Sequence, residues 1–376
     1  MKNFYFLINL LLIIFTIQKH FIIYAQEPLA SLWGINDTEI PRYLNIEKNL
    51  TLLDKIVKPF LNDSSFGGTW IDVKLNKVFI NTVNLSQVPI IKSLPELKTY
   101  LDFLEFQPAN NSLEYLKYSF NQIISILVSE YKPHNIFISI KPKDNNVVIA
   151  LGLDENDEIN QKFINATLHY GPKIRYLPSK NSSILRRADD REKIQVRLSG
   201  GDNIVGDSGL CSVGFLARKH CGPPCIKRKK DYIVTAGHCV SSLNVRFNHF
   251  VDGDAFFVGT MVSFSKNKYD YGLINIRKMD KRLKIRPSIR NFGSQDRELL
   301  ITDSIPASSH GAHLCKSGAK TKLTCGYIES FNGVFTDIND IILIDLIFTN
   351  SLSNEGDSGG PVFYFFRFTF SESSWH

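Results

Sequence analysis

Cysteine is scarce in this chain and confined to one part of it. The 376 residues contain six cysteines, none of which precedes Cys211 or follows Cys325. An even number of cysteines in a secreted domain is typical of a disulfide framework. Any such framework is therefore restricted to the carboxy-terminal part, and the first 210 residues must fold without one.

Long apolar segments are also lacking, except at the amino terminus. Residues 1–25 carry Lys2, an apolar run from Phe4 to Ile17 and a candidate cleavage point after Ala25. Polar residues from position 18 interrupt this run below the ~20 residues that a membrane span needs. The pattern predicts a secretory signal peptide at 1–25, an extracellular protein and no membrane contact once the signal is removed.

Strong charge runs are absent apart from Lys227–Lys230, and the formal net charge is a mild +7. Because no nucleic-acid motif accompanies this run, we interpret it as a solvated loop and expect no nucleic-acid partner.

Asn-X-Ser/Thr sequons occur only before Gly200. They predict a glycoprotein whose glycans are confined to that part of the chain. The seven sequons start at Asn36, Asn49, Asn62, Asn84, Asn110, Asn165 and Asn181.

Three separate stretches each supply one side chain of a possible catalytic set. They bring a histidine, an aspartate and a serine in that chain order, and the serine lies among glycines in a turn sequence. A single Ser-Gly-Gly-Pro turn is usually only a turn, so the prediction rests on the three together. The stretches are Tyr232–Cys239 with His238, Tyr269–Ile276 with Asp270, and Gly356–Pro361 with Ser358.

These residue types fit nucleophilic catalysis. A serine hydroxyl is a weak nucleophile near neutral pH and needs a base, which in turn needs an orienting partner. We expect His238 to take the proton of Ser358 and Asp270 to orient the imidazole. The backbone N–H groups of Gly356 and Ser358 are the expected donors to a developing oxyanion, and glycine at 356 permits the backbone angles required.

At these residues the chain resembles the chymotrypsin-fold serine endopeptidases, and more narrowly the α-lytic protease and streptogrisin branch. The narrower resemblance rests on Cys211–Phe215, Cys315–Gly318 and Cys325–Gly326, and it covers roughly Gly200–Phe363. It implies an all-β domain of two antiparallel Greek-key barrels with the catalytic residues at their junction. The activity implied is hydrolysis of peptide bonds in protein substrates through an acyl-enzyme, without a cofactor or metal.

The resemblance also implies structural pairs. It predicts the disulfides Cys211–Cys239 and Cys315–Cys325, and an ion pair between Lys316 and Asp357 in place of the family's arginine. Two cysteines have no counterpart, and by elimination we pair Cys221 with Cys225. The alternative for these two is a zinc site that includes His220.

The segment before the protease domain resembles, at Gly67–Trp70, the prosegment of the α-lytic type. We therefore divide the chain into a signal peptide (1–25), an α+β prosegment (26–199) and a trypsin-like protease domain (200–376). The resemblance implies a zymogen whose prosegment assists folding and inhibits in cis; an independent accessory domain is the alternative. Expected cleavage points are Arg186–Arg187 or the stretch Leu198–Gly200.

Local patterns predict most elements. We expect partly helical structure over residues 26–60 and no long helix after Cys211. The expected helices are Ser93 to about Phe106 with a capping box, Ser112 to about Tyr131, and Glu158–Tyr170. The expected strands are Phe66–Val73, Lys77–Val83, Asn135–Ile140, Asn146–Leu151, Phe256–Phe264, Gly272–Ile276, Gly326–Phe331 and Ile341–Phe348.

The carboxy terminus departs from the family pattern. Only residues 359–376 follow Ser358, and no cysteine lies in Asn350–Glu355, so the sequence predicts a protease domain that is truncated at its carboxy terminus. The leading hypothesis is a secreted, monomeric serine endopeptidase made as a proenzyme. The alternatives are a catalytically inactive homologue that acts as a binding or decoy protein, and an inhibitor of related proteases based on the amino-terminal part.

Overall fold

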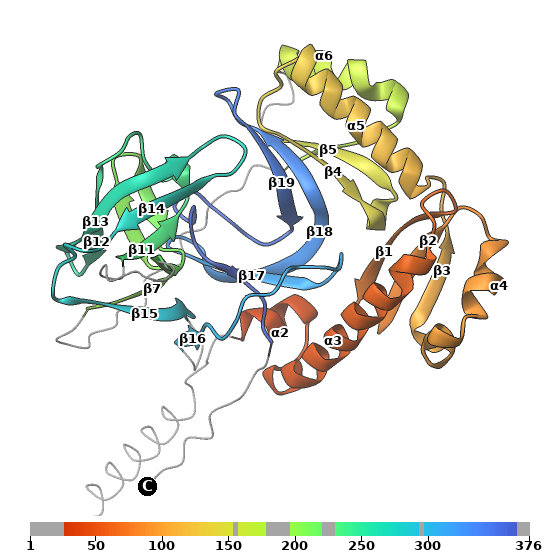
Figure 1. The fold of residues 1–376 in the computed structure, drawn as a ribbon, viewed down its shortest axis with the longest axis horizontal. Helices are drawn as coiled ribbons and strands as arrows, with labels where there is room; N and C mark the ends of the chain where they lie inside the picture. Colours follow the sequence, from red (N-terminus) through yellow and green to blue (C-terminus); the bar gives the residue numbers. More distant parts are fainter. Residues whose placement is uncertain (1–25, 153–156, 178–195, 220–229, 293–296, 367–376) are drawn as a thin grey trace, which may run out of the picture.

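The computed structural model describes residues 26–152, 157–177, 196–219, 230–292 and 297–366. An amino-terminal half (26–177), with helices and short sheets, lies beside a carboxy-terminal half (196–366) built almost entirely of strands (Figure 1). The expected signal peptide, the dibasic pair at 186–187 and the Cys221–Cys225 pair lie outside the described residues. Within the described residues, no helix has the length and apolar character that a membrane span requires.

The first sheet contains seven strands in the order β10-β11-β14-β13-β12-β8-β9, and neighbouring strands in it are antiparallel. Its side chains alternate between solvent and a core that includes the buried Phe247, Val258 and Met261, as expected for strands with one buried face. The strands are β8 (Asn203–Gly206), β9 (Gly209–Ser212), β10 (Leu216–Lys219), β11 (Lys230–Thr235), β12 (Arg246–Val251), β13 (Asp254–Ser265) and β14 (Tyr271–Asn275).

A three-stranded sheet follows, in the order β16-β15-β7. Strand β7 (Val196–Gly200) runs parallel to β15 (Leu283–Arg290), which also pairs with β16 (Glu298–Leu300). Leu198 and Ser199 are buried in β7. The chain is therefore built into the carboxy-terminal half from Val196 onward.

The second large sheet joins the two halves, and we call it the shared sheet. Its order is β20-β17-β18-β4-β5-β6, and β19 also pairs with β18. The junction is antiparallel pairing of β18 with β4, in which Phe335 lies opposite Phe137. The long β18 curves between the halves in Figure 1. The strands are β4 (Ile136–Lys141), β5 (Asn146–Leu151), β6 (Lys173–Tyr176), β17 (His313–Gly318), β18 (Lys322–Thr336), β19 (Ile342–Thr349) and β20 (Val362–Phe363).

The amino-terminal half has a sheet of its own, β1-β2-β3, in which β1 and β2 are antiparallel and β2 and β3 parallel. Its strands are β1 (Phe66–Asp72), β2 (Lys77–Thr82) and β3 (Leu104–Pro108). The α-helices are α2 (Pro28–Trp33), α3 (Ile40–Val57), α4 (Gln87–Lys92), α5 (Leu113–Ser129) and α6 (Glu158–Thr167). The short 3-10 helices are η1 (Asp37–Glu39), η2 (Lys58–Phe60), η3 (Pro95–Phe103), η4 (Pro142–Asp144), η5 (Leu168–Tyr170) and, in the other half, η6 (Gly237–Cys239).

The hydrophobic core around α3 is common to both halves. Buried Trp33 and Leu53 of the amino-terminal half belong to the same cluster as Leu323, Ile328 and Phe365 of the other half. Burial of apolar surface is the main favourable term in folding, so this cluster links the stability of the two halves.

Most expected elements are present, including the β1–β2 hairpin and α5, whose N-cap Ser112 accepts a hydrogen bond from the backbone N–H of Tyr115 at 3.1 Å. The expected helix from Ser93 to Phe106 is wrong in its last part. It is a 3-10 helix that ends at Phe103, after which Leu104 is buried in β3 opposite Val78. The expected capping box is not formed, because Ser93 Oγ donates to the carbonyl of Ile90 instead.

Candidate active site

His238 and Asp270 meet at one end of the first sheet. His238 lies in η6 just after β11, and Asp270 immediately precedes β14. These two strands are antiparallel neighbours, so the end of one lies beside the start of the other. Asp270 accepts a hydrogen bond from the backbone N–H of His238 at 2.9 Å through Oδ1, while its Oδ2 contacts His238 Nδ1. The His238 side chain is 52% exposed and that of Asp270 19%, which leaves the imidazole open to solvent.

The loop that carries Ser358 packs against the same end of the first sheet. The carbonyl of Ser358 accepts a hydrogen bond from the backbone N–H of Ser212 at 2.8 Å. Gly359 has φ +82°, and a β-carbon there would lie 2.7 Å from the backbone nitrogen of Ala236. Only glycine permits so close an approach at that φ. The serine loop is therefore in contact with the chain two residues before His238.

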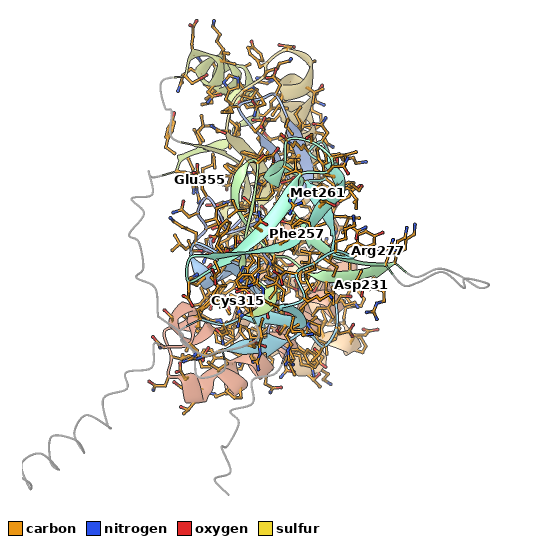
Figure 2. The ribbon with its side chains drawn as sticks, turned by 90° about the vertical axis from the view of Figure 1, so that its left-hand side faces the viewer. Asp231, Phe257, Met261, Arg277, Cys315 and Glu355 are labelled. Atoms are coloured by element: carbon orange, nitrogen blue, oxygen red, sulfur yellow. A yellow bond between two sulfur atoms is a disulfide. The ribbon has the colours of Figure 1, made fainter. Side chains whose placement is uncertain are left out.

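Gly356 is the other glycine that the loop conformation requires. Its φ is +98°, and a β-carbon would come within 2.8 Å of the Leu210 side chain. In Figure 2 the first sheet faces the viewer, and Phe257 and Met261 are labelled on its strand β13. Glu355, the residue before Gly356, is labelled to the left of Met261.

Asp357 is enclosed by hydrogen-bond donors from β17 and from the turn (319–321) between β17 and β18. Lys316 Nζ lies 2.8 Å from its Oδ2, as the sequence predicts, and the Lys316 side chain is mostly buried. Thr321 adds a hydroxyl donor at 2.6 Å and a backbone N–H at 2.9 Å, and the N–H of Lys320 adds another at 2.9 Å. Burial alone would raise the pKa of Asp357, but the hydrogen bonds from Lys316 and Thr321 outweigh it and hold the pKa below its usual 3.8.

Thr321 is the partner that sequence reasoning missed. Its hydroxyl accepts a hydrogen bond from Lys316 Nζ at 2.5 Å and donates to Asp357, so it extends the ion pair into a network. Threonine is common in turns, and nothing in the local sequence distinguishes this residue.

Two of the three expected disulfides lie within the described residues, and both are formed. Cys211–Cys239 joins the end of β9 to η6, which holds His238, and Cys315–Cys325 joins β17 to β18. Among the residues that the structure describes, no group of three or more metal-ligating side chains comes together.

Comparison with known proteins places the carboxy-terminal half in a family. A model of the trypsin family, described as Trypsin, matches residues 198–367. Serine protease 2 of Streptomyces fradiae is 30% identical over 170 residues, which cover 44% of this chain and 87% of that protein. Streptogrisin-D of Streptomyces griseus is 28% identical over 166 residues, which cover 44% of this chain but only 38% of that protein.

Part of this chain is also similar to solved structures. Thermobifida fusca Protease A is 25% identical, with a TM-score of 0.35, and the match covers 46% of this chain and 80% of that one. Nocardiopsis Protease is 21% identical, with a TM-score of 0.36, over 46% and 81% of the respective chains. Residues 198–367, which match the trypsin-family model, contain His238, Asp270 and Ser358. The chain belongs to the trypsin family of serine endopeptidases, with the chymotrypsin-like fold in its carboxy-terminal half.

Proposed function

We propose that this protein hydrolyses peptide bonds in protein substrates through Ser358, His238 and Asp270. The observation that carries the proposal is the contact of the Ser358 loop with the strand end that bears His238, whose ring is in turn held by Asp270. A nucleophile, a base and an orienting carboxylate on adjacent elements are the parts that acyl transfer requires.

The proposed reaction has two halves. The Oγ of Ser358 attacks the substrate carbonyl carbon as His238 accepts its proton, and the carbonyl oxygen becomes an oxyanion that the N–H groups of Gly356 and Ser358 bind. The C–N bond then breaks, and the imidazolium of His238 gives its proton to the leaving amine. A water molecule attacks the acyl-enzyme by the same route, which releases the acid and restores the Ser358 hydroxyl. Asp270 stabilises the imidazolium throughout.

We further propose that the chain is made as a proenzyme, with its amino-terminal half as an intramolecular folding helper and inhibitor. The shared sheet and the core around α3 support a half that folds with the protease rather than an independent accessory domain. Cleavage needs exposed chain, and Leu198–Gly200 is buried in β7. The proposed cleavage therefore lies within residues 178–195, and the protease begins at or before Val196.

Secretion and glycosylation are also proposals. They are supported by the composition of residues 1–25 and by the placement of the sequons, because an acceptor asparagine must be accessible to be modified. All six sequon asparagines in the described residues are exposed: Asn36, Asn49, Asn62, Asn84, Asn110 and Asn165.

A fluorophosphonate probe tests the catalytic proposal, since it reacts with an activated serine. We expect the secreted chain to be labelled once it has been cleaved within residues 178–195, and labelling to be lost in Ser358→Ala and in His238→Ala. His169→Ala is the matched control, because His169 is an exposed histidine of the amino-terminal half whose ring contacts Tyr170 in a tilted arrangement. If the folded chain stays unlabelled before and after cleavage in 178–195, the proposal fails and the inactive binding homologue is the better reading.

A further inference from the structure

Ser212, at the end of β9, is a fully buried serine whose every polar group is engaged. Its backbone N–H donates to the carbonyl of Ser358 at 2.8 Å, and its own carbonyl accepts from Thr235 Oγ1 at 2.9 Å. Its hydroxyl donates to the carbonyl of Gly356 at 2.8 Å and accepts from the backbone N–H of Ala319 at 2.9 Å. One side chain therefore touches both the serine loop and the β17–β18 turn.

The direction of the hydroxyl follows from these partners. A backbone N–H can only donate, so the Ala319 N–H uses a lone pair of Ser212 Oγ. The carbonyl of Gly356 can only accept, so the hydroxyl proton of Ser212 points to it. The contact is a specific hydrogen bond with one defined orientation.

The two carbonyls that Ser212 holds belong to the residues with the proposed oxyanion donors. Gly356 and Ser358 would each present an N–H to the oxyanion, and each has its C=O bonded to Ser212. Fixing the carbonyl of a residue fixes the peptide plane that follows it and limits rotation about that residue. For Gly356 this restraint matters most, because glycine has the widest choice of backbone angles.

A second restraint acts on Asp357, which lies between these two residues. The β17–β18 turn binds the Asp357 side chain through Lys320 and Thr321, and the same turn binds the Ser212 hydroxyl through Ala319. The Gly356–Ser358 segment is thus held by the turn on its aspartate side chain and by Ser212 on its backbone.

We propose that Ser212 is a positioning residue that keeps the oxyanion-binding backbone of Gly356 and Ser358 in its working conformation. The expected effect on kcat rests on the proposed function, whereas the expected restraint of the backbone at Gly356 does not depend on activity. Alanine at position 212 would keep the backbone bond to Ser358 and lose both hydroxyl bonds, so Gly356 would be released selectively.

The test compares Ser212→Ala with Ser288→Ala in the secreted chain after cleavage within residues 178–195. Ser288 is also a buried serine of the carboxy-terminal half, and its hydroxyl is hydrogen-bonded to Ser199 Oγ at 3.0 Å and to Glu298 Oε2 at 3.2 Å. Three quantities are measured in both variants and in the wild type: kcat and KM on a peptide substrate, the rate of fluorophosphonate labelling, and hydrogen exchange of the backbone amides of residues 354–361.

Loss of one oxyanion donor lowers kcat by roughly 10²–10³. Ser212→Ala leaves the donors in the chain but frees them, so we expect a fall in kcat and in labelling rate of about tenfold to a hundredfold. KM should change little, because oxyanion bonds form in the transition state. Exchange in 354–361 should become faster in Ser212→Ala only, and Ser288→Ala should resemble the wild type in all three measurements.

The outcomes separate the two proposals. Faster exchange in Ser212→Ala, with no labelling even of the wild type, would uphold the positioning role and reject the proposed activity. Exchange and labelling equal to those of Ser288→Ala would overturn the role of Ser212 and leave the activity intact. A rise in KM with unchanged kcat would likewise overturn it, since that result assigns Ser212 to substrate binding.

Discussion

The strongest test of the link between the two halves is removal of one buried charge, by Glu47→Gln in α3. The Glu47 and His313 side chains are both 0% exposed. The Glu47 carboxylate accepts from the backbone N–H of His313 at 2.7 Å, from its Nδ1 at 2.5 Å, and from the Tyr364 hydroxyl at 2.9 Å. The Nε2 of His313 accepts from the backbone N–H of Phe365 at 3.0 Å. His313 is therefore the neutral tautomer with its proton on Nδ1, and the negative charge of Glu47 is held by donors alone.

The surrounding tyrosines respond to that charge. Burial, and then the nearby charges of Asp72 and Glu47, raise the pKa of Tyr327 to about 12. Burial, then Glu47, also raises the pKa of Tyr364. Both phenols therefore keep their protons at any physiological pH, and Tyr364 remains a donor to Glu47.

The size of the effect follows from the number of donors. Glutamine offers one acceptor oxygen, and its NH₂ group then faces at least one of the three donors, which is left without a partner. Leaving one buried donor without a partner costs about 1–3 kcal/mol, and a domain is stable by only about 5–15 kcal/mol. We expect Glu47→Gln to lower the free energy of unfolding by about 1–3 kcal/mol.

The assay is urea unfolding of the full chain at pH 7, in a Ser358→Ala background that prevents self-digestion. Glu105→Gln is the control, because Glu105 is exposed and its contact with Lys77 spans 3.8 Å; exposed pairs are worth about 0–1 kcal/mol. We also expect one unfolding transition in both variants, since the halves share a core. Equal unfolding midpoints for Glu47→Gln and Glu105→Gln would refute the reasoning.

Three further predictions concern the network, a buried histidine and the cleavage point. Lys316→Met removes a buried partner of Asp357 and should reduce probe labelling far more than secretion; unchanged labelling would remove the role of Lys316. In the wild type the Asp357 pKa lies below 3.8, so the contribution of the Asp357 carboxylate to stability is complete above pH 3.8 and is lost only below it. Without Lys316 the Asp357 pKa should rise, and labelling of Lys316→Met should therefore fall at a higher pH than labelling of the wild type. Burial, then Lys58, lowers the pKa of His310 to about 4; the unfolded chain binds the proton first, so stability should fall between about pH 6.5 and 4 and His310→Phe should flatten that fall in urea midpoints. A dibasic-specific processing enzyme should cut the Ser358→Ala chain at Arg186–Arg187, and amino-terminal sequencing that finds the cut inside β7 would contradict the proposed boundary.

The sequence predicts the parts of the fold that local patterns determine. The apolar stripe of α5 buries Leu116, Ile123 and Leu127 at helical spacing, and alternation marks the β1–β2 hairpin. The catalytic order and the cysteine positions identify the carboxy-terminal half, because these chemical groups are few and their order in the chain is specific.

Contacts between distant segments were not predictable in the same way. Glu47 and His313 are 266 positions apart, and an isolated glutamate within a helix looks like any solvated residue until its partner is known. The helix expected through Phe106 fails for a related reason. Residues from Leu104 pair with β2 to form β3, and that non-local pairing overrides the local helical pattern.

Strand β18 connects the amino-terminal half to the candidate active site. Its first residue, Lys322, follows Thr321 and the turn that binds Asp357, and its last residues pair with β4. Contacts of high sequence separation form late, because closing a long loop costs entropy before the contact is made. If the amino-terminal half assists folding, β4 supplies a preformed edge on which β18 can pair, and an ordered β18 brings the turn to Asp357. One end of β18 then pairs with β4 of the amino-terminal half, and the other end follows the turn whose donors bind Asp357.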